Sequence, residues 1–404
     1  MTQNSCQTDI LIAGGGIAGL TLAAILGRAG IDVSVIDNFP PEPLKDTKPS
    51  ARTIALMQGS VNIIKAAGVW DQCKDFSAAL KAMRITDHDI DIEFDAFEIG
   101  QEEFGFNVPN SILRATLYEQ VQSLPSVTTY IPNALEDYKI EDNHVIAELK
   151  NGEIITARLL VGADGRNSSV RKISNIKCRE IKYKQHAITC VINHSNSHDN
   201  ISTEFHYPSG PLALVPLPGN QSSIVWVETP ERAEELLALK ESTFIETLQT
   251  QTNGLLGGIM LETKAQSWPL GSIRAKTLTA PRMALIAEAA HVMSPITAQG
   301  LNLSLRDVAA LAEVIADCLR LGLDPGTKTI LKNYESRRRI DITTRVFGVD
   351  GMNRIVSNDI PALQKLRQSG FKTLDRIPPL KKIAMQHGLA PQIDESRLAA
   401  GKPL

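Results

Sequence analysis

Three short stretches of the sequence combine residue types that bind nucleotides and other anions. The first is GGGIAG, in which Gly14, Gly16 and Gly19 stand at GxGxxG spacing. The second is LLVGADGRNSSVRK, residues 159–172, and the third is IAEAAHVMSPITAQGLNLSL, residues 286–305. Each runs from an apolar strand through a turn into the start of a helix, where unpaired N–H groups attract negative charge.

The glycines of the first stretch suit a dinucleotide pyrophosphate. Gly14 can form the tight turn, Gly16 lets the backbone approach the pyrophosphate, and Gly19 allows the helix to pack closely on the strand. Asp37 follows at the end of the next strand, where a carboxylate can accept hydrogen bonds from ribose hydroxyls. A purely structural glycine turn is the alternative, but strand, helix and acid together predict dinucleotide binding.

The other two stretches are less specific by themselves. Asp164 is expected at the carboxyl end of a sheet strand, where open α/β sheets bind ligands, although alone it is more typical of an Asp-Gly turn. The PITAQG loop precedes a helix start at Leu301 and Asn302, whose partial positive charge suits the negative N1 and C2 oxygen of a reduced flavin. Ordinary capping by Gln299 and Asn302 is the alternative, and His291 is predicted to be a structural histidine.

The composition excludes several classes of function. The net charge of −3 provides no positive field for nucleic acid. Five scattered cysteines predict reduced thiols in a cytoplasmic setting and no metal site. Residues 10–27 are uncharged, but their three consecutive glycines and the lack of Lys or Arg before them argue against a membrane span or secretory signal. A cytoplasmic protein is therefore expected.

Hydrophobic periodicity predicts the elements that position these stretches. Residues 9–37 fit a strand, a helix and a second strand, and the other elements expected are helices at 53–68, 111–123 and 301–322 and strands at 80–100, 126–163 and 181–274. Nucleotide-binding features alternate with strand-rich segments, so a β-rich insertion is expected within a discontinuous domain. The expected parts are a nucleotide-binding domain of 1–75, 101–178 and 276–340, a β-rich substrate domain of 76–100 and 179–275, and a helical region of 341–404.

The order of the three stretches resembles the flavoprotein aromatic hydroxylases of the para-hydroxybenzoate hydroxylase fold, and more narrowly the ubiquinone-biosynthesis hydroxylases. The resemblance covers nearly the whole chain. It extends to ARTIALMQGSV, LRATLYEQV, PSGPLALVPLPGNQSSIVW, QGLNLSLRDVAALAEVI and NYESRRRIDITTRVFGVDGMNRIVSN. It implies a Rossmann-like α/β FAD-binding domain with an inserted antiparallel β-sheet substrate domain and a helical C-terminal region.

The resemblance also implies a reaction and a set of cofactor contacts. In that family FAD is reduced, reacts with O₂ and, as a C4a-hydroperoxide, delivers oxygen to an electron-rich ring, which fits a sequence with no obvious nucleophile–base pair. The electron donor, NAD(P)H or another, stays open. The loop at Pro295 is expected to face the flavin. The expected FAD contacts are Gly14, Gly16, Ile17, Ala18, Gly19, Asp37, Arg52, Arg114, Asp164, Glu288, Gln299, Gly300, Leu301 and Asn302.

The sequence departs from the family pattern at three positions in the third stretch. Ala287 and Glu288 stand where the family usually has Gly-Asp or Gly-Asn, and Ala298 replaces the glycine before Gln299. An alanine adds a Cβ where the backbone comes close to the cofactor. Either the local backbone shifts, or FAD binds weakly.

The implied substrate is a lipophilic polyprenyl phenol. Lys365, Arg367, Lys372, Arg376, Lys381 and Lys382 make the C-terminal region basic. This pattern fits either a helix packed on the core with a solvated basic face, or contact with an anionic inner membrane or a partner protein. The alternatives to a ring hydroxylase are a halogenase or prenyl reductase of the same fold, although the halogenase WxWxIP motif is missing, and a non-catalytic flavoprotein of a biosynthetic complex.

Overall fold

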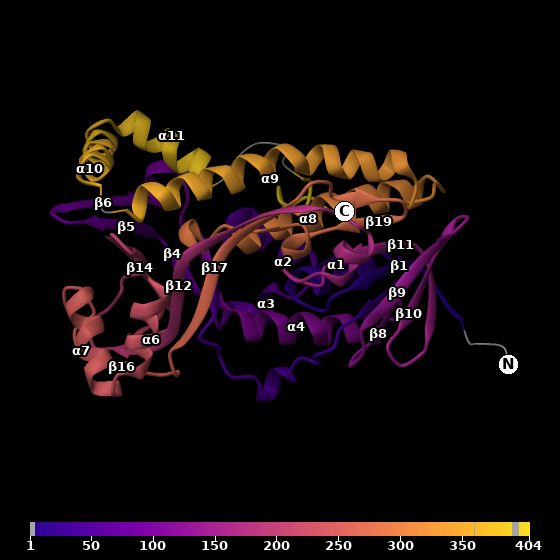
Figure 1. Cartoon of the computed structure of the whole chain (residues 1–404), viewed down its shortest axis with the longest axis horizontal. Helices are drawn as coiled ribbons and strands as arrows, with labels where there is room; N and C mark the ends of the chain where they lie inside the picture. Colours follow the sequence, from indigo (N-terminus) through magenta and orange to yellow (C-terminus); the bar gives the residue numbers. More distant parts are fainter. Residues whose placement is uncertain (1–4, 359, 390–395) are drawn as a thin grey trace.

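The computed structural model describes residues 5–358, 360–389 and 396–404, which form three β-sheets surrounded by helices (Figure 1). One sheet is largely parallel and has the order β18-β19-β11-β1-β2-β8, with β10 and β9 added antiparallel to β11. Its strands are β1 (Ser5–Ala13), β2 (Val33–Ile36), β8 (Val127–Tyr130), β9 (Leu135–Glu141), β10 (His144–Leu149), β11 (Ile154–Gly162), β18 (Thr279–Ala280) and β19 (Met283–Leu285). Residues 10–12 of β1 and 159–161 of β11 are completely buried, as expected for strands covered on both faces.

The helices beside this sheet bury small and aliphatic side chains. Helix α1 packs against α4 and α8, and α9 lies along α8 (Figure 1). These elements are α1 (Ile17–Arg28), α2 (Gln58–Ala66), α3 (Trp70–Lys74), α4 (Asn110–Gln122), α5 (Ser169–Ile173), α8 (Gly300–Arg320) and α9 (Lys328–Val356), with short 3-10 turns η1 (Leu44–Asp46), η3 (Ala287–Ala289) and η4 (Ile296–Ala298). One continuous apolar core joins these α-helices and η3 to the sheet.

A second, mostly antiparallel sheet forms the other half of the molecule. It has the order β20-β17-β12-β15-β14-β13-β5-β6, with β16 paired to β12. Its elements are β5 (Ala82–Asp87), β6 (Ile90–Asp95), β12 (Cys178–His194), β13 (Ile201–Tyr207), β14 (Gly210–Leu217), β15 (Gln221–Glu228), β16 (Ile259–Leu261), β17 (Gln266–Ala275) and β20 (His291–Val292). Helices α6 (Pro230–Ala238) and α7 (Glu241–Gln251) cover one face over a separate apolar core.

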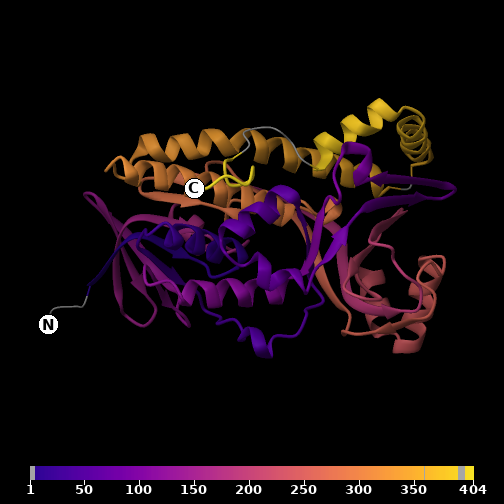
Figure 2. The same cartoon turned by 180° about the vertical axis from the view of Figure 1, so that it is seen from behind.

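A small third sheet and the C-terminal helices complete the chain. The third sheet consists of β3 (Thr53–Met57), β7 (Gly105–Pro109) and β4 (Ala78–Leu80). Beyond the end of α9, α10 (Pro361–Arg376) and α11 (Pro378–Leu389) lie against β6 and the 3-10 turn η2 (Ala96–Ile99) (Figures 1 and 2). No helix in these described parts is long and apolar enough to cross a membrane.

The predicted α/β fold with an antiparallel insertion is confirmed, but the helix expected at 53–68 was partly wrong. The helix expected at 53–68 begins only at Gln58, because residues 53–57 pair with β7 as strand β3. The boundary expected at 340/341 falls inside α9, a single helix. Pairing with a strand fifty residues away is not visible in local periodicity.

The expected solvated basic face at the C terminus was also partly wrong. The side chain of Arg367 is buried and its guanidinium pairs with Asp87 at 2.6 and 2.9 Å. Burial alone would raise the pKa of the Asp87 carboxyl, but hydrogen bonds and charge from Arg367 lower it overall. Lys381 pairs with Glu98 at 2.7 Å. Two of the six cations therefore fasten α10 and α11 to the neighbouring β5–β6 hairpin and η2.

Candidate active site

The three stretches identified in the sequence meet at one edge of the parallel sheet. Strands β1, β11 and β19 are adjacent, with Ala13 opposite Gly162 and Gly162 opposite Leu285. The chain stays paired past the strand ends, because Ala163 N–H donates to Ala13 O at 2.7 Å and Ile286 N–H donates to Gly162 O at 3.0 Å. All three loops therefore leave the carboxyl ends of neighbouring parallel strands, where α/β sheets bind ligands.

The glycine turn has the geometry that its sequence predicted. Gly14 has φ +119° and a Cβ there would overlap the carbonyl of Ala163. A Cβ on Gly19 would overlap the Gly14 carbonyl oxygen, so α1 can approach β1 only through glycine. At Gly16 a Cβ would meet open space, as the approach of a pyrophosphate requires. Ile17 and Ala18 follow in the first turn of α1, which has no side-chain cap and no acidic residue.

Asp37 and Arg114 lie together beside this turn. The Asp37 carboxylate accepts hydrogen bonds from Gly15 N–H at 2.6 Å and from Phe39 N–H at 2.8 Å. Arg114 donates from Nε to Gly15 O at 2.9 Å, and its Nη2 lies 3.4 Å from the Asp37 carboxylate. Both side chains are partly exposed, so they can contact a ligand while holding the turn.

The second stretch offers an acceptor that the protein leaves unused. Oδ2 of Asp164 accepts the N–H groups of Ser169 at 2.6 Å and Val170 at 3.1 Å, which caps α5. Its Oδ1 is buried without a hydrogen-bond partner among the described residues. A buried unpaired acceptor is costly, so a ligand with hydroxyl or ribityl donors fits this position.

Arg171 joins the second and third stretches. Its buried guanidinium donates to Ala289 O at 2.7 Å and to Arg166 O at 2.7 Å. Ala289 belongs to η3, which also contains Ala287 and Glu288, two of the positions where the sequence departs from the family pattern. No role was predicted for Arg171 from the sequence, because nothing local indicates that its partner Ala289 lies more than a hundred residues away.

The third stretch combines an exposed carboxylate with strained alanines. Glu288 is exposed and makes no hydrogen bond or ion pair to the described residues. Ala287 has φ +54° and Ala298 has φ +51°. Both alanines occupy the left-handed region that favours glycine, so the replacements seen in the sequence fall where the backbone prefers glycine.

The start of α8 presents a helix N terminus toward the same loop. Gln299 is its N-cap residue without a side-chain cap bond, and the first turn, with Gly300 and Leu301, has no acidic residue. Gln299 Oε1 instead accepts a hydrogen bond from Arg345 at 2.7 Å. The uncapped N–H groups and the helix dipole suit a negatively charged flavin ring. Pro295 lies exposed at the start of η4.

Asn302 and Arg52 have structural contacts of their own. The buried Asn302 amide accepts from Met57 N–H at 2.9 Å and donates to Ala55 O and Ala298 O, both at 2.8 Å. Its side chain therefore holds β3 against the loop before α8. Arg52 is exposed, with its guanidinium 5.3 Å from the ring centroid of Trp268.

A buried charge cluster beneath the third stretch was not predicted from the sequence. Asp307 is fully buried, and its Oδ2 accepts Ala287 N–H at 3.0 Å and lies 2.6 Å from His291 Nε2. Its Oδ1 accepts Arg338 Nε at 2.7 Å, and Arg338 also bonds Asp341 at 2.8 Å. Burial alone would raise the pKa of Asp307, but the charges and hydrogen bonds of His291 and Arg338 hold it below the ordinary value.

This cluster fixes the loop that the flavin is expected to contact. Burial would lower the pKa of Arg338, yet the charges of Asp307 and Asp341 raise it overall, so both partners stay ionised. The sequence feature that could have indicated this buried charge cluster is the charged pair Arg306-Asp307 inside a largely apolar helical stretch. His291 is a bonded buried histidine, consistent with its expected structural role.

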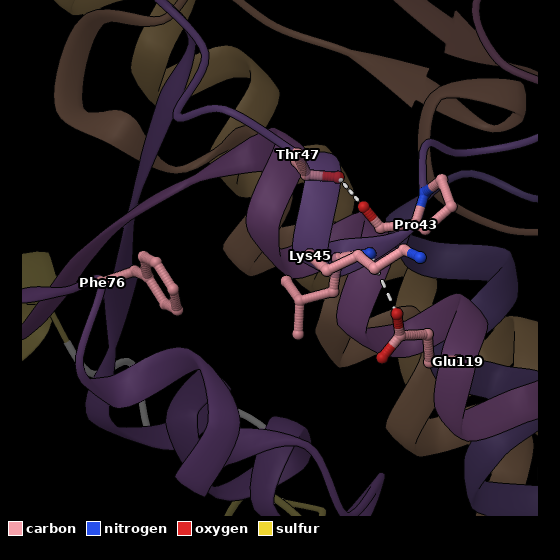
Figure 3. A pocket seen from close by; sticks show the side chains of 6 residues that line it. Pro43, Lys45, Thr47, Phe76 and Glu119 are labelled. Atoms are coloured by element: carbon pink, nitrogen blue, oxygen red, sulfur yellow. Dashed lines mark hydrogen bonds between the residues drawn. The ribbon is translucent and has the colours of Figure 1, made fainter.

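A surface hollow is formed by residues outside these loops. It is lined by Pro43, Leu44, Lys45, Thr47, Phe76 and Glu119 (Figure 3). Glu119 of α4 accepts Leu44 N–H at 2.9 Å, and Thr47 donates to Pro43 O at 2.9 Å (Figure 3). The hollow contains none of the residues predicted to bind FAD.

We expect the strain at Ala287 to be measurable. Replacing Ala287 by glycine should raise the free energy of unfolding by about 0.5–1 kcal/mol, because glycine adopts the left-handed conformation without a Cβ clash. Denaturant unfolding checks this. Ala289→Gly is the matched control, since Ala289 is buried with an ordinary backbone and its replacement should lower stability. Equal losses for both variants would contradict the assignment of strain.

Comparison with known proteins agrees with this geometry. The FAD binding domain family matches residues 7–346. The chain belongs to this family. It is 35% identical over 98% of its length to the ubiquinone hydroxylase UbiL of Rhodospirillum rubrum, covering 93% of that protein. It is 31% identical to the 3-demethoxyubiquinol 3-hydroxylase of Escherichia coli, with 95% of this chain and 98% of that one covered.

Solved structures support the same fold. The p-nitrophenol 4-monooxygenase PnpA from Pseudomonas putida superposes with a TM-score of 0.79 at 17% identity, covering 96% of this chain and 99% of that one. The predicted family, fold class and FAD cofactor are therefore confirmed, and the chain is an FAD-dependent monooxygenase. The individual FAD contacts stay predictions, including those assigned to Arg52 and Glu288.

Proposed function

We propose that this enzyme hydroxylates the aromatic ring of a polyprenylated phenol during ubiquinone biosynthesis. The observation that supports it most is the convergence of three loops at the ends of β1, β11 and β19, beside the uncapped N termini of α1 and α8. The names of the most similar curated relatives support the substrate class.

The reaction must balance two electrons and one molecule of oxygen. One oxygen atom of O₂ is inserted into a ring C–H bond to give a hydroxyl. The other leaves as water, with two electrons supplied by NAD(P)H or another donor and two protons supplied by the donor and solvent. Bound FAD supplies the oxygen-activating chemistry. The protein's part is to bind and orient the ring, to exclude water and to stabilise charge.

The geometry suggests how the chain holds the cofactor. Gly14, Gly16 and Gly19 would hold the pyrophosphate at the start of α1, with Asp37 and Arg114 toward the adenosine ribose. The other residues proposed to contact FAD are Ile17, Ala18, Arg52, Asp164, Glu288, Gln299, Gly300, Leu301 and Asn302. In this arrangement the free Oδ1 of Asp164 would accept from the ribityl chain.

An absorption titration with FAD, followed by turnover under ¹⁸O₂, tests the proposal. We expect about one FAD per chain, oxidation of NAD(P)H that a prenylated phenol stimulates, and one ¹⁸O atom in the ring product. A halogenated or reduced product would instead indicate a different flavin reaction on this fold. FAD binding without any turnover, with several electron donors supplied, would favour a non-catalytic flavoprotein of a biosynthetic complex.

Peripheral contact with an anionic membrane is the second part of the proposal. The exposed cations on α10 and α11 are Lys365, Lys372, Arg376 and Lys382, and the exposed apolar side chains beside them are Ile360, Ile377, Leu380 and Ile383. Basic residues interleaved with aliphatic ones suit an anionic lipid surface, which is where a polyprenylated substrate resides. Both groups lie at the end of the molecule formed by α10 and α11 (Figures 1 and 2).

Liposome flotation checks this contact. We expect the protein to float with vesicles containing anionic lipid at low salt, and less as salt rises. Replacing Lys372, Arg376 and Lys382 together by glutamate should abolish flotation. The matched control replaces Lys150, Lys328 and Lys332, which are exposed away from α10 and α11, and should float normally. Flotation lost equally in both variants would indicate a dependence on total charge.

A further inference from the structure

Among the buried polar atoms that have no hydrogen-bond partner in the described residues, one lies on β7 and one on β15. Asn107 and Ser223 each have 0% exposure. Asn107 Oδ1 and Ser223 Oγ have no hydrogen-bond partner in the part of the chain that the structure describes. Buried polar groups in folded proteins nearly always have partners, so two unpartnered groups from different sheets need an explanation.

Ser223 faces the flavin-binding half of the molecule. It lies on β15 directly opposite Val215 of β14, so the two side chains share one face of the sheet. The alternate residues of these strands, such as Leu214 and Ile224, point to the other face, into the core beneath α6 and α7. Val215 instead packs on the apolar cluster that contains Met57. Ala298 of the loop before α8 packs on the same cluster.

Asn107 reaches the same cluster from the small sheet. It lies on β7 opposite Ala55 of β3, and Ala55 belongs to the cluster. Its Nδ2 donates to Pro216 O of β14 at 2.8 Å, which places its amide beside β14, one residue from Val215. The two unused atoms, Asn107 Oδ1 and Ser223 Oγ, therefore border one apolar cluster from two sides.

The cluster is attached to the candidate flavin loop. Asn302 at the start of α8 bonds to Met57 N–H and Ala55 O, and its amide also holds Ala298 O. The buried members of the cluster are Ala55, Met57, Leu80, Ala96, Phe104 and Met385. Methionine side chains are flexible and can move to admit a ligand. Met385 comes from α11, in the region proposed to contact lipid.

We propose that this cluster is the ring-binding site, and that Asn107 and Ser223 recognise a hydroxyl group on the ring. A phenol has one donor and one acceptor on the same oxygen, so it can donate to Asn107 Oδ1 and accept from Ser223 Oγ–H. The aliphatic and thioether side chains contact the ring faces, next to the loop where oxygen transfer is proposed. This inference rests on the proposed ring hydroxylation and adds the residues that select a phenol.

Removing the Ser223 hydroxyl separates this role from a structural one. Binding is measured for two probes, a 2-prenylphenol and the matching prenylbenzene that lacks the hydroxyl, together with the melting temperature of the FAD-loaded protein without probe. In Ser223→Ala we expect the melting temperature to stay equal or rise, because an unpartnered polar atom is removed. Affinity for the phenol should fall about 5–10-fold, with prenylbenzene affinity unchanged.

Ser222→Ala is the matched control. Ser222 is the neighbouring buried serine on the opposite face of β15, and its Oγ bonds to His194 Nε2 at 3.0 Å. This variant should lose stability and keep the preference for the phenol. Asn107→Leu is the second variant of the site. It should lose some stability with the Pro216 contact, and it should lower the preference for the phenol over prenylbenzene as Ser223→Ala does.

The outcomes distinguish the failure of this inference from that of the proposed function. If the wild-type enzyme hydroxylates the phenol but Ser223→Ala and Asn107→Leu leave the preference between probes unchanged, the site assignment is wrong and the function stands. A lower melting temperature of Ser223→Ala with unchanged phenol affinity would make the serine structural. If the wild-type enzyme neither binds nor hydroxylates the phenol, both proposals fail.

Discussion

Replacing Asp307 by asparagine should lower the free energy of unfolding by roughly 3–5 kcal/mol and weaken FAD binding, because it leaves buried charges without their partner. The carboxylate is fully buried and receives Ala287 N–H, His291 Nε2 and Arg338 Nε within 3.0 Å. An amide cannot compensate the charge of Arg338. It also cannot accept three hydrogen bonds in the same geometry, so η3 should lose its fixed position.

Denaturant unfolding and FAD titration measure the two effects. Asp317→Asn is the control on the same helix, since Asp317 is half exposed and pairs with Arg397 at 2.8 Å. An exposed pair contributes at most about 1 kcal/mol, and this control should bind FAD normally. Similar losses in both variants would show that the buried cluster has no special role.

Protonation of the Asp307 carboxylate should lower the stability of the protein at acid pH. The pKa of Asp307 in the folded protein lies below its ordinary value of 3.8, because the charges and hydrogen bonds of His291 and Arg338 outweigh burial. Its contribution is therefore complete above about pH 4 and is lost as the pH falls through the lowered folded-state pKa. In Asp307→Asn the acid unfolding curve should lack this component.

Replacing Gly19 by alanine should abolish measurable FAD binding and cost about 1–3 kcal/mol of stability, because the new Cβ would overlap the Gly14 carbonyl oxygen. That overlap forces α1 away from the turn whose N–H groups are expected to hold the pyrophosphate. Alanine is otherwise the better helix former, so steric exclusion must outweigh a favourable propensity.

Replacing a second helical glycine by alanine should change the stability in the opposite direction. Gly348 lies exposed inside α9, and a Cβ there would meet no neighbouring atom within 4 Å. Gly348→Ala should therefore raise stability by about 1 kcal/mol and leave FAD binding unchanged. FAD fluorescence quenching measures the FAD affinity of the two variants, and unfolding curves measure whether each one gains or loses stability. Normal FAD affinity in Gly19→Ala would contradict the role of close helix–strand packing.

The sequence by itself determined the parts of this protein that depend on local order. The GxGxxG spacing after an apolar strand predicted the turn in which Gly14 has a positive φ and Gly19 contacts Gly14. Alternating strands predicted the antiparallel sheet. The order of the three stretches along the chain predicted the family and FAD, because that order is specific even though each motif alone is weak.

Only the tertiary structure decided the contacts between distant segments. Residues 53–57 become strand β3 through pairing with β7, and Arg367 is buried because Asp87, far away in sequence, provides its partner. Asp307 and Ser223 look ordinary in the sequence, since burial and the presence or absence of partners depend on which elements pack together. Local periodicity shows which side of an element is apolar, whereas the chemistry of a site depends on what lies opposite it.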